Sequence, residues 1–181
     1  MFVHYTFVGW VFSKGNVGSL ALFACEFTNC TFATFDFRRI VVGAHGGFFH
    51  DCNFTACDFR GRLFGYPHFA RCTFNRCKLK GVSFNDASFS RTKFIGKLAD
   101  CTFSGLYHEA STGHQPIDRV DFSEAILGEF VTFENCDLAN SIPPTGFEFS
   151  ELLDSIYADD PTTLSTGSRD RIVLRRFTSD K

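Results

Sequence analysis

A period of five residues constrains this chain more than any other feature of its sequence. Between Cys52 and Phe103, a large apolar residue, here called position i, recurs at every fifth residue. These residues are Phe54, Phe59, Phe64, Phe69, Phe74, Leu79, Phe84, Phe89 and Phe94. The position two residues earlier is mostly small and holds Cys52, Cys57, Cys72, Cys77, Val82, Ala87 and Thr92. Such a period fits neither a helix nor a flat strand, so the chain is an array of internal repeats.

Phenylalanine dominates the repeat. The 181 residues include 25 Phe against one Trp, four Tyr and one Met, and 17 of the 25 Phe fall at position i when every register is counted. An ordinary core mixes Leu, Ile, Val and Phe, so this bias indicates one structural slot that is filled repeatedly. The length suits one domain or one repeat array with a substantial core.

The eight cysteines belong to the same pattern. Each lies two residues before a Phe or Leu at position i, at Cys25, Cys30, Cys52, Cys57, Cys72, Cys77, Cys101 and Cys136. A thiol in this slot is a compact apolar filler, and no pair has the C-x-x-C spacing of zinc sites. We therefore predict reduced packing thiols in a reducing compartment. No catalytic, metal-binding or cofactor-binding residues are predicted.

The period breaks at three places. It slips by two residues between Phe37 and Phe49, where glycines make a bulge plausible. It loses one residue at 96–98, and residues 105–119 carry no repeat and are expected to form a loop before the pattern returns at 120–140. We expect a repeat domain over residues 1–140 with its register break near 40–48, followed by a C-terminal helix and tail over 141–181.

Four residues do not suit the small slot that they occupy. Tyr5 and Trp10 are too large for it, which is typical of a terminal repeat that acts as a cap. Arg62 and Pro67 fall in the same slot farther along the chain. Because burying an unpaired guanidinium is costly, we expect this side to distort so that Arg62 reaches solvent.

The sequence changes character after residue 144. Apolar residues then follow helical spacing at Phe149, Leu152, Leu153, Ile156 and Tyr157, which predicts a short amphipathic α-helix. This helix either covers the open end of the repeat array or pairs with a second copy to form a homodimer. No role is assigned to the basic tail at 169–177.

Several units resemble a known family. Cys-Asp-Leu-Ala-Asn at 136–140, Ala-Ser-Phe-Ser-Arg at 87–91 and Cys-Asn-Phe-Thr-Ala at 52–56 resemble the A-[DN]-[LF]-x-x unit of pentapeptide repeat proteins. The resemblance covers about residues 5–105 and 120–140 and implies an all-β fold, a right-handed quadrilateral parallel β-helix with five residues on each of four sides. Residues twenty apart would then stack at about 4.8 Å, with Phe54, Phe74 and Phe94 in one column.

Charge is distributed unevenly along the chain. The net charge of -2 conceals 12 Lys/Arg against 6 Asp/Glu in residues 1–105 and one Arg against 12 Asp/Glu in residues 106–160. Such asymmetry points to a charged partner or to the two ends of an elongated body. The candidate protein-binding residues are Arg60, Arg71, Arg76, Lys78, Lys80, Arg91, Lys93, His108, Glu109, Asp121, Glu124, Glu129 and Glu134. The alternative is that these charges only keep the outer faces soluble.

Three functions remain open. The first is a non-enzymatic, cytoplasmic scaffold that binds an unidentified protein, since the apolar start is too short for a membrane span and lacks signal-peptide features. The second follows from the resemblance, whose quinolone-resistance branch mimics DNA, binds gyrase or topoisomerase IV and dimerises through a C-terminal helix. The basic body departs from that pattern. The third and weakest is a thiol enzyme. No small-molecule substrate or membrane is expected, and nucleic-acid binding is disfavoured because no aromatic platform lies outside the core.

Overall fold

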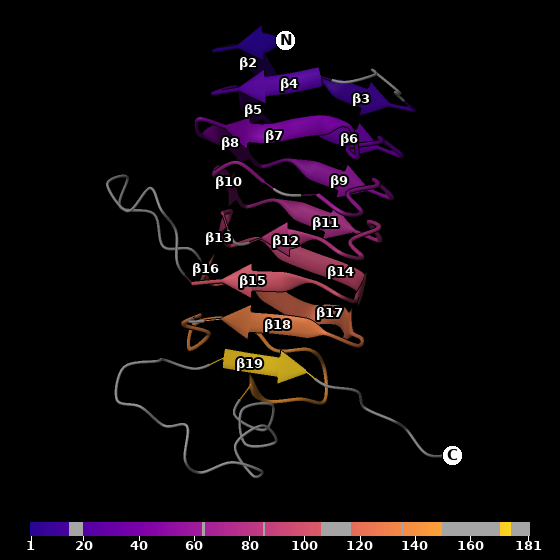
Figure 1. The fold of residues 1–181 in the computed structure, drawn as a ribbon, viewed down its shortest axis with the longest axis vertical. Coiled ribbons are helices and arrows are strands. Elements are labelled where there is room, and N and C mark those ends of the chain that lie inside the picture. Colours follow the sequence, from indigo (N-terminus) through magenta and orange to yellow (C-terminus); the bar gives the residue numbers. More distant parts are fainter. Residues whose placement is uncertain are drawn as a thin grey trace.

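The computed structural model describes residues 1–14, 20–62, 64–84, 86–105, 117–134, 136–149 and the strand at 171–174. The chain winds into a parallel β-solenoid in which each turn, here called a coil, adds one short strand to the sheets beneath it (Figure 1). Two of the sheets contain six strands, so the chain passes each of those sides six times. The predicted all-β parallel β-helix is confirmed.

The sheets run along the sides of the solenoid. The first contains β1 (Phe2–Val3), β4 (Leu20–Phe23) and β7 (Ile40–Ala44). The second contains β2 (Thr6–Val8), β5 (Glu26–Thr28), β8 (Gly47–His50), β10 (Pro67–Ala70), β13 (Ser88–Ser90) and β16 (Ile117–Asp118). The third contains β3 (Val11–Ser13), β6 (Thr31–Ala33), β9 (Asn53–Thr55), β11 (Thr73–Asn75), β14 (Lys93–Leu98) and β17 (Asp121–Leu127). The fourth contains β12 (Ser83–Phe84), β15 (Thr102–Ser104), β18 (Val131–Glu134) and β19 (Arg171–Leu174), the last of which runs antiparallel to β18.

Strands are short because the backbone turns a corner after each one. Stacked corner residues share a left-handed conformation, as in the column of Asn29, Asp51, Arg71 and Arg91, whose φ angles are 53°, 54°, 53° and 49°. Side chains at alternate positions of each strand point inward, which places positions i and i−2 in the core. The first and fourth sheets lie along the same side of the solenoid, where Phe64 stacks on Phe84. On the remaining side, the described residues form isolated parallel bridges of Asp58 with Asp36 and with Lys78, and the ends of β14 and β17 pair beyond them.

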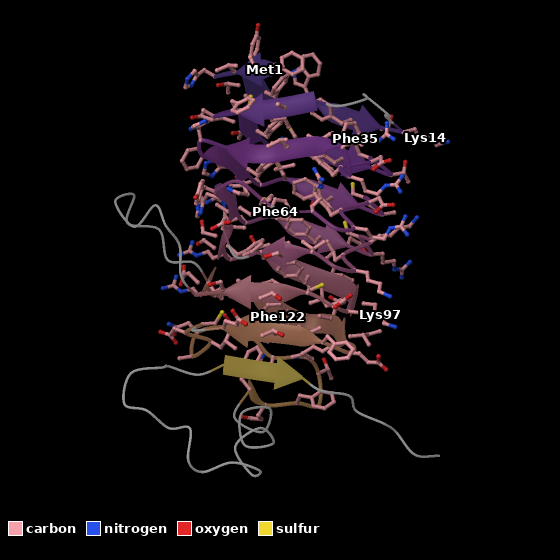
Figure 2. All side chains as sticks on the ribbon, in the orientation of Figure 1. Met1, Lys14, Phe35, Phe64, Lys97 and Phe122 are labelled. Atoms are coloured by element: carbon pink, nitrogen blue, oxygen red, sulfur yellow. The ribbon has the colours of Figure 1, made fainter. Side chains whose placement is uncertain are left out.

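Stacked phenylalanine rings fill the core. Along the third sheet, Phe54 and Phe74 stack with their ring centroids 4.7 Å apart, and Phe74 and Phe94 are 5.0 Å apart. Phe69 and Phe89 stack in a second column at 5.3 Å. The predicted columns are therefore present, with the spacing expected of hydrogen-bonded strands. Figure 2 shows the side chains along the length of the solenoid.

Strand pairing locates the breaks in the period. Phe27 pairs with Phe49, two residues beyond the regular step of twenty. Part of this excess is a bulge between β4 and β7 at Gly43, where the backbone has φ +75° and lies against Pro67. Farther on, Phe84 pairs with Phe103, one residue short of the regular step.

The expectation for Arg62 is wrong. The side chain remains half-buried, and its Nη1 donates a hydrogen bond of 3.0 Å to the carbonyl oxygen of Ile40 on the preceding coil. Its Nε is buried without a hydrogen-bond partner. One backbone carbonyl therefore holds the guanidinium against the preceding coil, so the side chain does not extend freely into solvent. At the N-terminal end, Tyr5 and Trp10 are about half exposed and stack on Phe7 and Phe12, as expected of a terminal coil that caps the core.

The C-terminal end is covered in part by Phe149. Its ring packs edge-on against Phe122 and Phe133, with centroid distances of 6.1 and 6.0 Å. The rest of the predicted helix, through Leu152, Leu153, Ile156 and Tyr157, lies outside the described residues, as do loop residues 106–116 with His108 and Glu109. Among the described helical residues, none forms a segment with the length and apolar character needed to cross a bilayer.

Candidate protein-binding surface

Three of the seven candidate cations are already paired with carboxylates. Arg60 Nη2 lies 2.7 Å from Asp58 Oδ2, and Arg71 Nε lies 2.7 Å from Asp51 Oδ1 on the coil before it. Lys93 Nζ contacts Asp121 at 3.1 Å and Glu124 at 2.8 Å. These three cations therefore already form ion pairs within the solenoid, which makes them weaker candidates for contacts with a partner protein.

The arginine pairs shift the ionisation of the acids that they contact. The hydrogen bond from Arg71 lowers the pKa of Asp51, and the hydrogen bond from Arg60 lowers that of Asp58. Arg38, one coil earlier, lowers the pKa of Asp36 to about 2. These carboxylates are therefore charged at neutral pH.

The other four candidate cations make no ion pair within the described part of the chain. Arg76 and Arg91 are corner residues with positive φ, next to the third sheet. Lys78 and Lys80 lie on the side without a continuous sheet, where Lys78 bridges to Asp58 through its backbone. The cations without an ion pair thus form two sets. Arg76 and Arg91 lie at corners, and Lys78 and Lys80 lie on the side without a continuous sheet, here called the open side.

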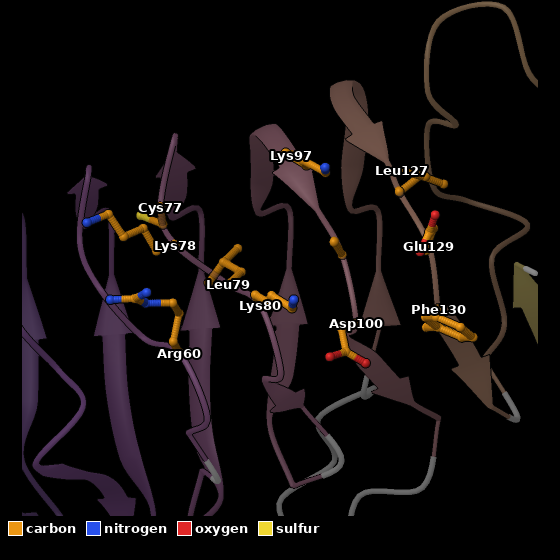
Figure 3. Close-up of a pocket in the computed structure, with 12 residues that line it drawn as sticks. Arg60, Cys77, Lys78, Leu79, Lys80, Lys97, Asp100, Leu127, Glu129 and Phe130 are labelled. Atoms are coloured by element: carbon orange, nitrogen blue, oxygen red, sulfur yellow. The ribbon is translucent and has the colours of Figure 1, made fainter. Parts of the chain in front are cut away.

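The open side is hollowed into a groove of about 740 Å³ (Figure 3). Its lining includes Arg60, Cys77, Lys78, Leu79, Lys80, Lys97, Ala99, Asp100, Leu127, Gly128, Glu129 and Phe130. The groove brings three of the predicted cations together with Glu129, which was also predicted. It adds Lys97 and Phe130, which sequence reasoning missed.

The repeat is one residue short at 96–98, and the strands beside the groove are unusually long there. β14 continues without a break from Lys93 to Leu98, and Leu98 pairs with Leu127 in the equally extended β17. Gly128 N then donates a 2.7 Å hydrogen bond to the Leu98 carbonyl oxygen. A Cβ on Gly128 would lie 3.1 Å from that oxygen and 3.2 Å from Cε of Lys97, so the chain segments approach closely here.

Phe130 is the unusual residue of the groove. Its backbone has φ 56° and its side chain is 57% exposed. Backbone hydrogen bonds stack its corner on those of Gly61, Gly81 and Asp100. Glycine and aspartate suit a left-handed corner, whereas a bulky aromatic residue there is an outlier. Both its conformation and its exposure to water are unfavourable for Phe130.

The described acidic residues do not form one continuous negative face. Lys93 forms ion pairs with both Asp121 and Glu124, and Arg119 Nε lies 3.7 Å from Asp118 Oδ1. Glu129 lies in the basic groove, whereas the backbone of Glu134 pairs with β19. The candidate acidic residues are therefore divided between different surroundings.

The thiols line the interior as predicted. Cys52 and Cys72 are buried and donate hydrogen bonds to the carbonyl oxygens of Phe27 and Phe49, at 3.4 and 3.2 Å. Hydrogen bonding from Cys72 lowers the pKa of Cys52, whereas burial raises that of Cys72. Burial also raises the pKa of Cys101 to about 11. The sulfurs of Cys52 and Cys72 are therefore packed inside the solenoid, shielded from solvent.

A buried polar pair lies on the second sheet, at outward positions that the sequence analysis did not select. His68 Nδ1 is 2.6 Å from Ser88 Oγ, and both residues are buried. The twenty-residue separation puts them on adjacent strands, so the stacking rule would have found the contact. Within the described ranges, no group of three or more His, Cys, Asp or Glu residues is arranged to hold a metal ion.

Comparison with known proteins finds one family model and two solved structures that resemble this chain. Residues 68–96 match the family model for pentapeptide repeats, with 8 copies. Two solved structures of trypsin-treated QnrB1 variants, described as a plasmid-mediated fluoroquinolone resistance protein, align with 78% of this chain and 78% of theirs. Their sequence identities are 15% and 14% and their TM-scores are 0.30 and 0.31, values too low to support an argument about fold or function. No curated protein sequence matches the chain.

Proposed function

We propose that this chain, a pentapeptide-repeat protein, is a non-enzymatic cytoplasmic scaffold that binds another protein through its charged outer surface. One observation carries the proposal: Arg76, Lys78, Lys80 and Arg91 have no ion-pair partner in the described structure, although nearby cations do. Short strands stacked on a ring-filled core hold these charges on a rigid support. A fixed array of unpaired charge favours association with a surface of opposite sign.

Affinity capture from the native cytoplasm tests the scaffold proposal. The full chain is compared with a variant in which Arg76, Lys78, Lys80 and Arg91 are all replaced by glutamate. We expect the wild-type chain to retain a protein that the variant loses, and the retention to weaken as salt is raised. Failure to retain any protein above an unrelated control, or equal retention by the variant, would contradict the proposal.

The DNA-mimic alternative requires an acidic surface that follows the rod. In the described structure, Lys93 pairs with Asp121 and Glu124, which interrupts such a surface, and we therefore rank this function second. A gyrase supercoiling assay with and without a quinolone separates the two functions. Inhibition or protection at micromolar protein would favour the mimic, whereas no effect would exclude it.

The thiol-enzyme alternative is disfavoured by burial. Cys52 and Cys57 are fully shielded, and Cys136, which is only half-buried, has a pKa raised to about 12 by burial. We expect iodoacetamide to leave the cysteines unmodified in the native protein and to modify them after unfolding. Rapid modification of one cysteine in the native protein would revive the alternative.

Homodimerisation through the predicted C-terminal helix is a separate proposal. The contact of Phe149 with Phe122 and Phe133 instead favours covering of the solenoid end. Light scattering separates the two roles, because a monomer at micromolar concentration would exclude the dimer.

A further inference from the structure

We propose that the groove on the open side binds an extended acidic segment of a partner protein, whose carboxylates contact Lys78, Lys80 and Lys97 and whose apolar side chain packs against Phe130. The inference rests on the proposed scaffold function and deepens it by naming one surface and the chemistry of its ligand. All twelve residues that line the groove lie in the described part of the chain (Figure 3).

The cations of the groove are available to a ligand. Asp58 already holds Arg60, but Lys78, Lys80 and Lys97 have no ion-pair partner in the described structure, and all three line the same groove. Three ammonium groups around one depression raise the local concentration of anions. Each exposed pair with a ligand carboxylate contributes little alone, so a ligand needs several carboxylates at once.

Phe130 supplies the apolar part of the site. Its ring is 57% exposed in a left-handed conformation, although the equivalent corners one and more coils earlier hold Asp100, Gly81 and Gly61. Positive φ recurs at other corners, Tyr66 among them, so the exposure of its ring is what distinguishes Phe130. Leu127 and Leu79 also line the groove, so an apolar ligand side chain would find an apolar surface beside the lysines.

The length of the groove suits a short extended peptide. From the coil of Arg60 to the coil of Phe130 there are three coil spacings, or about 14 Å at about 4.8 Å each. An extended chain covers that distance with about four residues. The ligand would run along the solenoid axis, with carboxylates toward Lys78 and Lys80 and its apolar side chain toward Phe130.

The same groove is poorly suited to a nucleic acid. Asp100 and Glu129 line it next to Phe130 and would repel a phosphate backbone running its full length. A peptide avoids this repulsion because its apolar residue occupies that end. A single exposed ring also offers no series of stacking platforms for bases.

Selection from a displayed library of random peptides on the full chain tests the inference. We expect enriched peptides to carry two or more Asp or Glu beside an aromatic or large aliphatic residue. Replacing Lys78 and Lys80 together by glutamine should weaken an enriched peptide about tenfold. Phe130→Asn should weaken it about fivefold, and asparagine tolerates the left-handed corner, so folding should be retained.

Lys14→Gln is the matched control. It removes an exposed corner cation that has no ion pair in the described structure and lies outside the groove, and it should change binding by less than about twofold. A neutral or basic consensus, unchanged binding by the lysine double variant, or displacement of the peptide by single-stranded DNA of equal charge would overturn the inference. If a captured cytoplasmic partner instead depends on Arg76 and Arg91 but not on the groove, the scaffold function stands and this inference fails.

Discussion

Two stretches of the solenoid follow the same repeat with different strictness. From Phe49 to Phe94 the paired residues of successive coils are twenty apart. From Phe94 onward the steps vary, because Phe84 pairs with Phe103 and Phe103 pairs with Phe133, at 19 and 30 residues.

The stacking of the core rings is nearly the same in both stretches. Phe84 and Phe103 still stack at 4.7 Å, and Phe103 and Phe133 at 5.0 Å. The residue lost at 96–98 is accommodated outside the ring columns, beside the groove in which Phe130 is exposed. The comparison teaches that ring stacking fixes the fold, whereas departures from the period shape the surface available to a partner.

Truncating a ring in the regular stretch should have the largest effect. Phe74 is 1% exposed and stacks on both Phe54 and Phe94, so Phe74→Ala should lower the free energy of unfolding by about 3–5 kcal/mol. Phe12→Ala, in the same column but half-buried at the end, should cost about 1–2 kcal/mol. Urea denaturation measures both changes. Equal costs would show that stacking on two sides adds nothing to the stability of the column.

The sequence predicted the core much better than the candidate site. The period places Phe and Cys inward because alternation in a strand is local, and twenty residues per coil then determine which side chains stack. Arg62 was misjudged because its hydrogen bond to the Ile40 carbonyl depends on the coil beside it. Lys97 and Phe130 were missed because a groove arises from a change in coil shape, which a count of residues locates but does not describe.

The bulge at Gly43 allows a sharper test of the register break. A Cβ at Gly43 would lie 2.6 Å from Cβ of Pro67, whereas a Cβ at Gly61 would meet no atom within 4 Å, although both glycines have positive φ. Gly61→Ala should therefore cost about 1 kcal/mol from backbone strain, and Gly43→Ala about 3 kcal/mol because the clash is added. Thermal and urea unfolding of both variants provide the measurement. Similar losses would mean that the chain relaxes around Pro67 without cost.

Phe130 allows a test of whether the irregular stretch carries strain for binding. Phe130→Asn should raise the free energy of unfolding by about 1 kcal/mol, since asparagine tolerates positive φ better than a bulky aromatic residue. Phe130→Ala removes the ring but retains a Cβ at the strained position, so it should give no such gain. Urea denaturation of the two variants separates the effect of backbone conformation on stability from the effect of removing the ring. A loss of stability in the asparagine variant would show that the ring supports the fold.

The smallest expected effect concerns the acid dependence of the regular stretch. The hydrogen bond from Arg38 lowers the pKa of Asp36 to about 2, and arginines likewise lower the pKa of Asp51 and Asp58. An aspartate in the unfolded chain has a pKa of about 3.9, so these carboxylates stabilise the fold fully above that pH. Their contribution is lost as the pH falls from about 4 toward 2, because the folded state must then accept protons that it binds weakly.

Urea unfolding at pH 6 and at about pH 3 should therefore show a modest loss of stability at the lower pH, since the pairs are largely exposed. Asp36→Asn should reduce that loss, and about 1 M salt should reduce it further by screening the pairs. The irregular stretch offers a comparison within the same chain, because Lys93 joins Asp121 and Glu124 across β14 and β17. Asp121→Asn should also reduce the loss at low pH, since hydrogen bonds from Ser123 and Lys93 outweigh burial and lower the pKa of Asp121. If neither variant changes the acid dependence, the ion pairs of both stretches do not contribute measurably to the free energy of unfolding.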